Sequence, residues 1–139
     1  MASIRKHVTR DVVTLEGGAP IRDAARIMAD RKIGSVAVRD DGKIVGLVTE
    51  RDLVLTVLAR AGNANQPLRE AMRPGVPHVP IDATETETAA LMRDNTTRHL
   101  LVEDRGQIVG IVSMRDIIQL MLDEKQFLIE QLQTYIEGR

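Results

Sequence analysis

Two short segments of the chain combine a hydroxyl residue, an arginine and an acid at the same spacing. The segments run from Thr49 to Asp52 as "TERD" and from Ser113 to Asp116 as "SMRD". A carboxylate is suited to accept two hydroxyl hydrogen bonds, as from a ribose, while a neighbouring Ser or Thr hydroxyl faces a phosphate. The spacing therefore suits a ligand that carries both hydroxyl groups and phosphate.

The same four residues also fit a helix capping box, which is the alternative interpretation. In a capping box the hydroxyl and the acid satisfy free N–H groups of the first helical turn. Arg51 and Arg115 do not help such a cap, because the helix dipole disfavours a cation in the first turn. Helix N-termini that follow strands bind anions, and Gly46 and Gly110, on strands expected to be central, allow close backbone approach. These features favour a ligand site over a cap alone.

The chain repeats itself at an offset of 64 residues, the difference between Gly42 and Gly106. "GKIVGLVTERDL" from Gly42 lies over "GQIVGIVSMRDI" from Gly106 without a gap, and the same offset places Val38 over Val102. Self-similarity at a fixed offset indicates two copies of one structural unit. The two copies fill residues 1–122.

Within each copy the apolar spacing changes from a helical period to a strand period. In the first copy Pro20 is expected at the first position of a helix that Gly34 ends. Two strands joined by an Asp-Gly turn follow in "SVAVRDDGKIVGLV", and a second helix is expected to open at Thr49, or at Ser113 in the second copy. Each copy is thus predicted to be a β-α-β-β-α unit of an α/β (α+β) protein.

A single three-stranded sheet cannot cover both of its faces, so the copies are expected to pack through their sheets about a pseudo-twofold axis. The expected boundaries are 1–60 for the first repeat, 61–67 for a linker, 68–122 for the second repeat and 123–139 for a tail. Leu128, Leu132 and Tyr135 recur at helical spacing in the tail, which is expected to extend the preceding helix. Its apolar stripe would cover the same module or another subunit, and its area favours the subunit.

Composition excludes several classes of protein. With 139 residues and 43% hydrophobic content, the chain can form one compact domain or two very small ones. A net charge of -1 and only two aromatic residues, Phe127 and Tyr135, argue against a nucleic-acid partner. The chain has no cysteine, and "MASIRKHVTRDVV" contains no apolar run for a signal peptide or a membrane span. We therefore expect a cytoplasmic protein without a membrane partner.

Catalytic motifs are not found in the sequence. His7, His78 and His99 lack the spacing of metal ligands, and Asp52 and Asp116 belong to different copies. There is no P-loop and no Gly-x-Gly-x-x-Gly run. We expect no enzymatic activity, no catalytic cofactor and no metal site.

At these motifs the chain resembles the cystathionine β-synthase (CBS) domain family, whose tandem pair is called a Bateman module. The resemblance covers residues 4–122, through "MRPGVPHVP", "GSVAVRDDGKIVGLVTERDL" and "TRHLLVEDRGQIVGIVSMRDI". In this family the segment glycine-hydrophobic-x-Thr/Ser-x-x-Asp contributes to an adenosyl-nucleotide site between the repeats. The resemblance implies that both copies carry such a site.

The resemblance gives the two copies of this segment matching roles. The acids would bind ribose hydroxyls, the hydroxyl residues would approach phosphate, and the arginines would border the sites. In that order the residues are Asp52 and Asp116, Thr49 and Ser113, and Arg51 and Arg115.

The family also draws base-pocket atoms from the partner repeat, so each site would be completed across the cleft. The implied residues are Ile33, Gly34 and Ser35 for the Asp116 site, Thr97, Arg98 and His99 for the Asp52 site, and Val13 or Pro77 beside the adenine. Arg98 and His99 stand where basic family members meet phosphates, whereas the first copy has only Gly34 and Ser35 there. On this ground the Asp116 site is expected to prefer the phosphorylated ligand, with the Asp52 site weaker or selective for another ligand.

The resemblance implies a standalone regulatory protein with no attached enzyme. It would bind AMP, ADP, ATP or another adenosyl compound and alter an unidentified protein target or its own assembly. Modules of this kind usually dimerise, so a homodimer is expected. The alternative is a scaffold that oligomerises without a ligand and uses the two segments only as helix caps.

Overall fold

The two hairpins expected from the repeat are present in the computed structural model, which describes residues 3–138. They join β2 (Ser35–Asp40) to β3 (Lys43–Thr49) and β5 (His99–Asp104) to β6 (Gln107–Ser113). The turn residues have positive φ, 51° and 76° at Asp41 and Gly42 and 53° and 78° at the equivalent pair. Tight two-residue hairpin turns require this left-handed conformation, which is why Asp-Gly predicts them.

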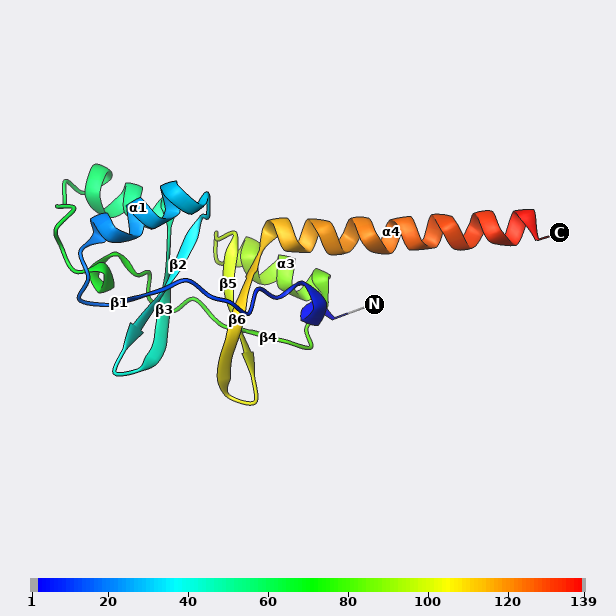
Figure 1. The fold of residues 1–139 in the computed structure, drawn as a ribbon, viewed down its shortest axis with the longest axis horizontal. Coiled ribbons are helices and arrows are strands. Elements are labelled where there is room, and N and C mark those ends of the chain that lie inside the picture. The colour runs from blue at the N-terminus through cyan, green and yellow to red at the C-terminus, as the bar shows by residue number, and fades with distance from the viewer. Residues whose placement is uncertain (1–2, 139) are drawn as a thin grey trace.

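The remaining elements follow the β-α-β-β-α order in both repeats. In chain order they are η1 (Ile4–His7), β1 (Thr14–Glu16), α1 (Ile21–Arg31), α2 (Glu50–Leu53), η2 (Val54–Ala59), η3 (Leu68–Ala71), β4 (Val79–Pro80), α3 (Glu85–Asp94) and α4 (Met114–Glu137). The η elements are single turns of 3-10 helix, except η2, which is π-helical. Figure 1 shows the hairpins side by side, pointing the same way, with α4 extending away from the repeats.

Each repeat contains one three-stranded sheet, in the order β1-β2-β3 or β4-β5-β6. The first strand of each sheet is parallel to the second, and the hairpin partner is antiparallel to it. The strands with Gly46 and Gly110 therefore lie at the sheet edges, and the expectation that they are central is wrong. The hairpin places its second strand on one side of β2 or β5, and the parallel strand takes the other side. The two sheets adjoin where β3 contacts β5.

The leading segments of the two repeats are exchanged. Ile4, at the start of the chain, is fully buried in the core of the second repeat, and its N–H donates to the Ala83 carbonyl at 2.9 Å. Leu68, its equivalent at the offset of 64, is fully buried in the core of the first repeat, and its N–H donates to the Ala19 carbonyl at 2.7 Å. Each hydrophobic core is therefore completed by the leading segment of the other repeat.

The two edge glycines accommodate these exchanged segments. A β-carbon on Gly46 would lie 2.6 Å from the Met72 sulfur, and one on Gly110 would lie 2.5 Å from the Thr9 carbonyl oxygen. Thr9 also exchanges two backbone hydrogen bonds with Ile111, each 2.9 Å long. The predicted close backbone approach is present at Gly110, whereas at Gly46 a side chain approaches, and both neighbours belong to the other repeat's leading segment.

Helix α1 differs from its prediction at both ends. Pro20 is the N-cap residue and the first helical residue is Ile21, one position later than expected. The helix ends at Arg31 because Lys32 adopts the left-handed conformation, with φ 54°, and its N–H donates to the Met28 carbonyl. Gly34 therefore does not end the helix, and its lack of a side chain serves another purpose described below.

The second helices of the two repeats are unequal. In the first repeat α2 is short and continues as the π-helical η2, whereas α4 runs unbroken through the predicted tail to Glu137, with Gly138 as its C-cap residue. The predicted extension of this helix is thus confirmed. Among residues 3–138 no helix is long and apolar enough to cross a membrane.

Candidate functional site

Both "Thr/Ser-x-x-Asp" segments form complete capping boxes. Oδ2 of Asp52 accepts hydrogen bonds from the Thr49 N–H at 2.8 Å and from the Thr49 hydroxyl at 3.0 Å, and the same hydroxyl accepts one from the Asp52 N–H at 3.3 Å. Ser113 and Asp116 repeat this arrangement at 2.8, 2.9 and 3.2 Å. The capping interpretation is confirmed for both helices.

Capping leaves half of each carboxylate available. All of these hydrogen bonds go to Oδ2, and Oδ1 of Asp52 and of Asp116 accepts none from residues 3–138. The Thr49 and Ser113 hydroxyls, by contrast, donate their only hydrogen to the capping oxygen. Capping and ligand binding are therefore compatible for the acids, whereas the two hydroxyls could donate to a phosphate only by releasing the acids.

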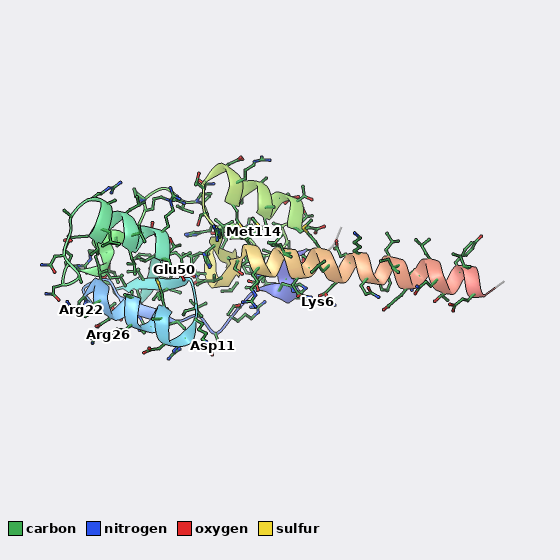
Figure 2. The ribbon with its side chains drawn as sticks, turned by 90° about the horizontal axis from the view of Figure 1, so that it is seen from above. Lys6, Asp11, Arg22, Arg26, Glu50 and Met114 are labelled. Atoms are coloured by element: carbon green, nitrogen blue, oxygen red, sulfur yellow. The ribbon has the colours of Figure 1, made fainter. Side chains whose placement is uncertain are left out.

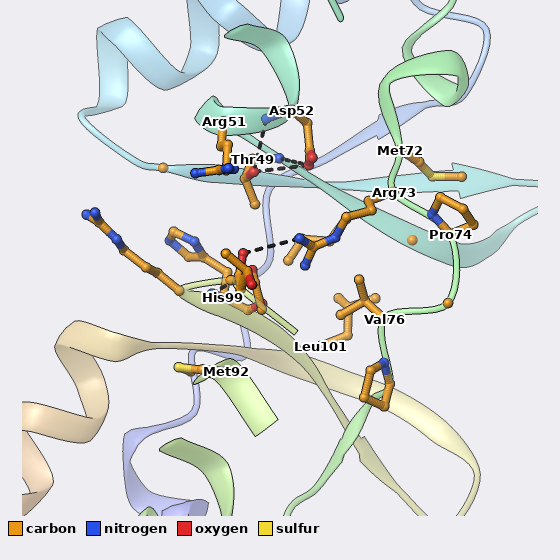
Figure 3. Close-up of a pocket in the computed structure, with 18 of the residues that line it drawn as sticks. Thr49, Arg51, Asp52, Met72, Arg73, Pro74, Val76, Met92, His99 and Leu101 are labelled. Atoms are coloured by element: carbon orange, nitrogen blue, oxygen red, sulfur yellow. Dashed lines mark hydrogen bonds between the residues drawn. The ribbon is translucent and has the colours of Figure 1, made fainter. Parts of the chain in front are cut away.

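Asp52 lies in a cavity of about 830 Å³ between the two repeats, here called the Asp52 cavity. This volume is within the range of about 300 to 1,000 Å³ that is usual for small-molecule sites. The cavity brings together the sequence-predicted residues Thr49, Arg51, Asp52, Pro77, Thr97, Arg98 and His99. Apolar side chains including Met72, Val76 and Leu101 form one wall, and the capping box forms the opposite wall (Figure 3).

Five arginines line the Asp52 cavity against two acids, Glu50 and Asp52. Two of the arginines are neutralised by carboxylates outside the cavity lining. Arg69 pairs with Asp40 at 3.0 Å, which raises the pKa of this guanidinium, and Arg93 pairs with Asp94 at 3.0 Å. The other three, Arg51, Arg73 and Arg98, form no ion pair within residues 3–138.

Arg73 is held in place by the opposite repeat. It follows η3, and its Nη1 donates to the backbone carbonyl of Thr96 at 3.2 Å, across the cavity (Figure 3). This bond leaves its remaining N–H groups and its whole charge available. Three guanidinium groups without an ion pair, the half-buried Arg73 and the exposed Arg51 and Arg98, make the Asp52 cavity an anion-binding environment.

Asp116 lies in a second cavity of about 540 Å³, here called the Asp116 cavity. It brings together Val13, Ile33, Gly34, Ser35, Arg98, His99, Ser113, Arg115 and Asp116. Every sequence-predicted site residue thus lines one of the two cavities, on the side of the cleft where it was expected. The cations of the Asp116 cavity are Lys32, Arg98 and Arg115, fewer than those of the Asp52 cavity.

Arg98 and His99 line both cavities, and the His99 ring lies between them. A β-carbon on Gly34 would lie 3.0 Å from Cε1 of His99, so the glycine gives the ring its space. Burial lowers the pKa of His99, while the negative charges of Glu50 and Asp116 partly oppose this effect and the Arg98 charge adds to it. Glu50 and Met114, the first residues of α2 and α4, lie near the centre of the molecule in Figure 2.

The sequence interpretation missed several charged residues of the cavities. Arg69 lies in η3 and Arg73 follows it, at the start of the second repeat, and Glu50 lies inside the motif itself. The sequence signal for these two arginines is their spacing of four residues. This signal was weak, because the segment that carries them was considered only as the start of the second repeat. Within residues 3–138 no group of three or more His, Asp or Glu side chains could hold a metal ion.

Comparison with known proteins identifies the repeated unit. A family model described as a CBS domain matches residues 4–59 and again residues 68–123. An uncharacterised protein of Methanopyrus kandleri is 36% identical to the chain over 124 residues. The matched region is 85% of this chain and 62% of that protein, so the chain spans less than two thirds of that relative's length.

Solved structures share the fold. The crystal structure of a CBS-domain protein from Agrobacterium tumefaciens has a TM-score of 0.77 at 33% sequence identity, covering 86% of this chain and 93% of that one. A hexameric CBS-CP12 protein from bloom-forming cyanobacteria has a TM-score of 0.73 at 26% identity, covering 85% of this chain and 70% of that one.

Proposed function

Because the chain belongs to the CBS-domain family, with one domain at residues 4–59 and another at 68–123, we propose that it is a regulatory module that binds an adenosyl nucleotide between its repeats. Proteins of this family are generally regulatory. Binding would change the cleft between the repeats and, through it, a protein target or the assembly of the chain itself. A ligand shifts such an equilibrium only by the difference in its affinity for the two states.

The observation that carries this proposal is the availability of Oδ1 of Asp52 inside the charged cleft. Oδ2 is used by the capping box, and Oδ1 accepts no hydrogen bond from residues 3–138. Asp52 is only 8% exposed, and its cavity also holds the uncompensated Arg73 and Arg98. A half-satisfied carboxylate beside free guanidinium groups suits a ligand with a diol at one end and phosphate at the other.

We assign the phosphorylated ligand to the Asp52 cavity. The sequence favoured the Asp116 site because Arg98 and His99 belong to the second repeat, but these residues line both cavities. Arg73 lines only the Asp52 cavity, which is also the larger one. In this assignment Asp52 accepts the ribose hydroxyls, Arg73 and Arg98 meet the phosphates, and the apolar wall takes the adenine. The Asp116 cavity then binds a second, less charged adenosyl ligand through Asp116.

A ligand-independent scaffold is the second candidate function. Its supporting observation is that both capping boxes are complete without any ligand. On this hypothesis the two motifs serve stability alone, and the chain acts only through the surfaces it offers to other subunits. Both hypotheses include self-association, and we propose a homodimer for either.

The two functions are separated by a thermal-shift titration of protein freed from carried-over nucleotide. The panel is AMP, ADP, ATP, S-adenosylmethionine and NAD, with inorganic tripolyphosphate as the control that lacks adenosine. A ligand at one hundred times its Kd stabilises the folded state by about 2.7 kcal/mol, so a binder gives a clear, concentration-dependent rise in Tm. Flat curves for every adenosyl compound would support the scaffold, and a response to tripolyphosphate alone would contradict adenosine recognition.

A further inference from the structure

Helix α4 carries a continuous apolar stripe that nothing in its own module covers. The helix still contacts the rest of the module at Asp123, whose Oδ2 lies 3.7 Å from Nε2 of His7, and farther along it extends alone (Figure 2). Nine large apolar side chains from residue 118 to residue 136 are 39% to 70% exposed, and the eight other than Phe127 form this stripe. Covering them requires a partner that runs along about five turns of helix.

The stripe repeats every seven residues. Residues seven apart lie in one column along the helix. One column contains Ile118, Lys125 and Leu132, and a second contains Met121, Leu128 and Tyr135. Residues of the two columns alternate along the chain at spacings of three and four. A third column beside them, Leu122, Ile129 and Ile136, widens the stripe. Columns that alternate at spacings of three and four form the seam between two helices packed along each other. The stripe therefore suits a second helix with the same repeat.

Lys125 sets the direction of the partner helix. It is the only polar residue in the two alternating columns, and it lies near their centre. In a parallel pair Lys125 would face its own copy, and the two ammonium groups would repel each other. In an antiparallel pair Lys125 faces Leu128, Met121 faces Leu132 and Ile118 faces Tyr135, so every position of both columns is matched. The ammonium of Lys125 can then reach toward the partner's Glu124, one turn away.

The area of the stripe is sufficient for a stable dimer. Burying its eight side chains removes on the order of 800 Å² from water on each copy, about what one side of a standard protein–protein interface buries. Apart from Lys125, the centre of the interface is apolar, as in stable interfaces.

We propose that α4 pairs in antiparallel orientation with α4 of a second copy, with Lys125 opposite Leu128. The two modules then lie at opposite ends of the helical pair, and because Ile118 also lines the Asp116 cavity, the partner's Tyr135 lies at the edge of that cavity. This inference makes the proposed homodimer specific and does not depend on nucleotide binding.

The dimer is tested by sedimentation equilibrium of the full chain without nucleotide. The wild-type protein is expected to be a dimer, and Leu132→Glu is expected to weaken association at least a hundredfold, because it places a carboxylate in the stripe. Thr134→Glu adds the same charge on the opposite, exposed face of α4 and is expected to leave the dimer unchanged. Circular dichroism checks that both variants keep their helix. A monomeric wild-type protein, or equal association of all three proteins, would overturn the proposal.

The orientation is tested by disulfide formation, which is clean because the chain has no cysteine of its own. A mixture of Met121→Cys and Leu132→Cys proteins is expected to form a cross-linked dimer under mild oxidation, and neither variant alone should do so. Efficient cross-linking of Met121→Cys with itself would show a parallel pair and overturn the orientation. Since no nucleotide is present in either experiment, their failure would leave the nucleotide proposal intact, and flat nucleotide titrations would leave the dimer intact.

Discussion

The imidazole ring of His99 packs on the backbone of Gly34, where an added β-carbon would lie 3.0 Å from Cε1 and 3.2 Å from Nε2. The ring belongs to the second repeat and the glycine to the first, so this contact joins the two repeats between the two cavities. Burial there lowers the pKa of His99 from its ordinary value of 6.5, against the opposing charges of Glu50 and Asp116. The folded protein thus prefers the neutral ring.

This preference predicts a loss of stability in mild acid. The unfolded chain binds a proton at His99 near pH 6.5, whereas the folded chain binds it only at lower pH. The contribution of His99 is therefore fully present above pH 6.5 and decreases as the pH falls through the lowered pKa of the folded state. Urea unfolding at pH 7.5 and 5.5 should show a smaller decrease for His99→Gln than for the wild type. Equal decreases would contradict a buried neutral histidine.

Loss of the Asp52 carboxylate should have two separable effects. Asp52→Ala removes half of a capping box and is expected to destabilise the fold by about 0.5 to 2 kcal/mol. It should also abolish the nucleotide-induced rise in Tm. Thr84→Ala is the matched control, because Thr84 caps α3 through the Glu87 N–H at 3.2 Å and lines neither cavity. It should lower Tm similarly and keep the nucleotide response. If Asp52→Ala also keeps that response, the carboxylate is only a cap.

Arg73 should decide which cavity binds phosphate. Arg73→Ala is expected to weaken ATP binding about tenfold or more, since a hydrogen bond to a charged group contributes about 1.5 to 3 kcal/mol. Isothermal titration calorimetry measures this change, with Arg26→Ala, on the exposed face of α1 (Figure 2), as the control. A loss of affinity in Arg115→Ala but not in Arg73→Ala would reverse our assignment and restore the ranking expected from the sequence.

The two edge glycines should differ in their tolerance of a methyl group. Overpacking costs about 1 to 3 kcal/mol, and Gly110→Ala should lie at the upper end because the added carbon meets the Thr9 backbone at 2.5 Å. Gly46→Ala should lie at the lower end because its neighbour, at 2.6 Å, is the flexible Met72 side chain. Chemical denaturation of both variants checks the order. Equal costs would show that the exchanged segment at Thr9 is free to move.

Lys125→Leu should tighten the α4 dimer. A charged residue within an apolar seam sets register at a cost in stability, and a buried Leu contributes about 1.5 to 3 kcal/mol. The dimer Kd from sedimentation is therefore expected to fall at least tenfold. Thr134→Leu adds an apolar side chain off the stripe and should change little. Unaltered association in Lys125→Leu would place Lys125 outside the interface.

Local patterns in the sequence predicted the hairpins, both helix caps and the extension of α4, because each depends on residues close together in the chain. The family resemblance, and not a local pattern, implied which residues face each other across the cleft. The end of α1 was missed because Lys32, a non-glycine residue, adopts the left-handed conformation with φ 54°. That conformation costs only about 1 to 2 kcal/mol, which the N–H to carbonyl bond at Met28 and the surrounding fold can offset.

Long-range packing was beyond the reach of these patterns. Ile4 and Leu68 align with each other in the repeat, and nothing in their types shows that each is buried in the opposite core. Arg73 of the Asp52 cavity was missed for the same reason, since it reaches the site only because the exchanged segment passes along it.

The exchange of leading segments also separates the order of synthesis from the order of folding. When the first sixty residues have left the ribosome, their core still lacks Leu68 and Ala71, and the segment that carries Ile4 has no core to enter. Ile4 must wait until β6 and the start of α4, with Val112 and Ile117, have been made. The first core has all of its residues once Met72 has been made, whereas the second core joins Ile4 to residues as late as Leu120 and can close only after α4 has begun.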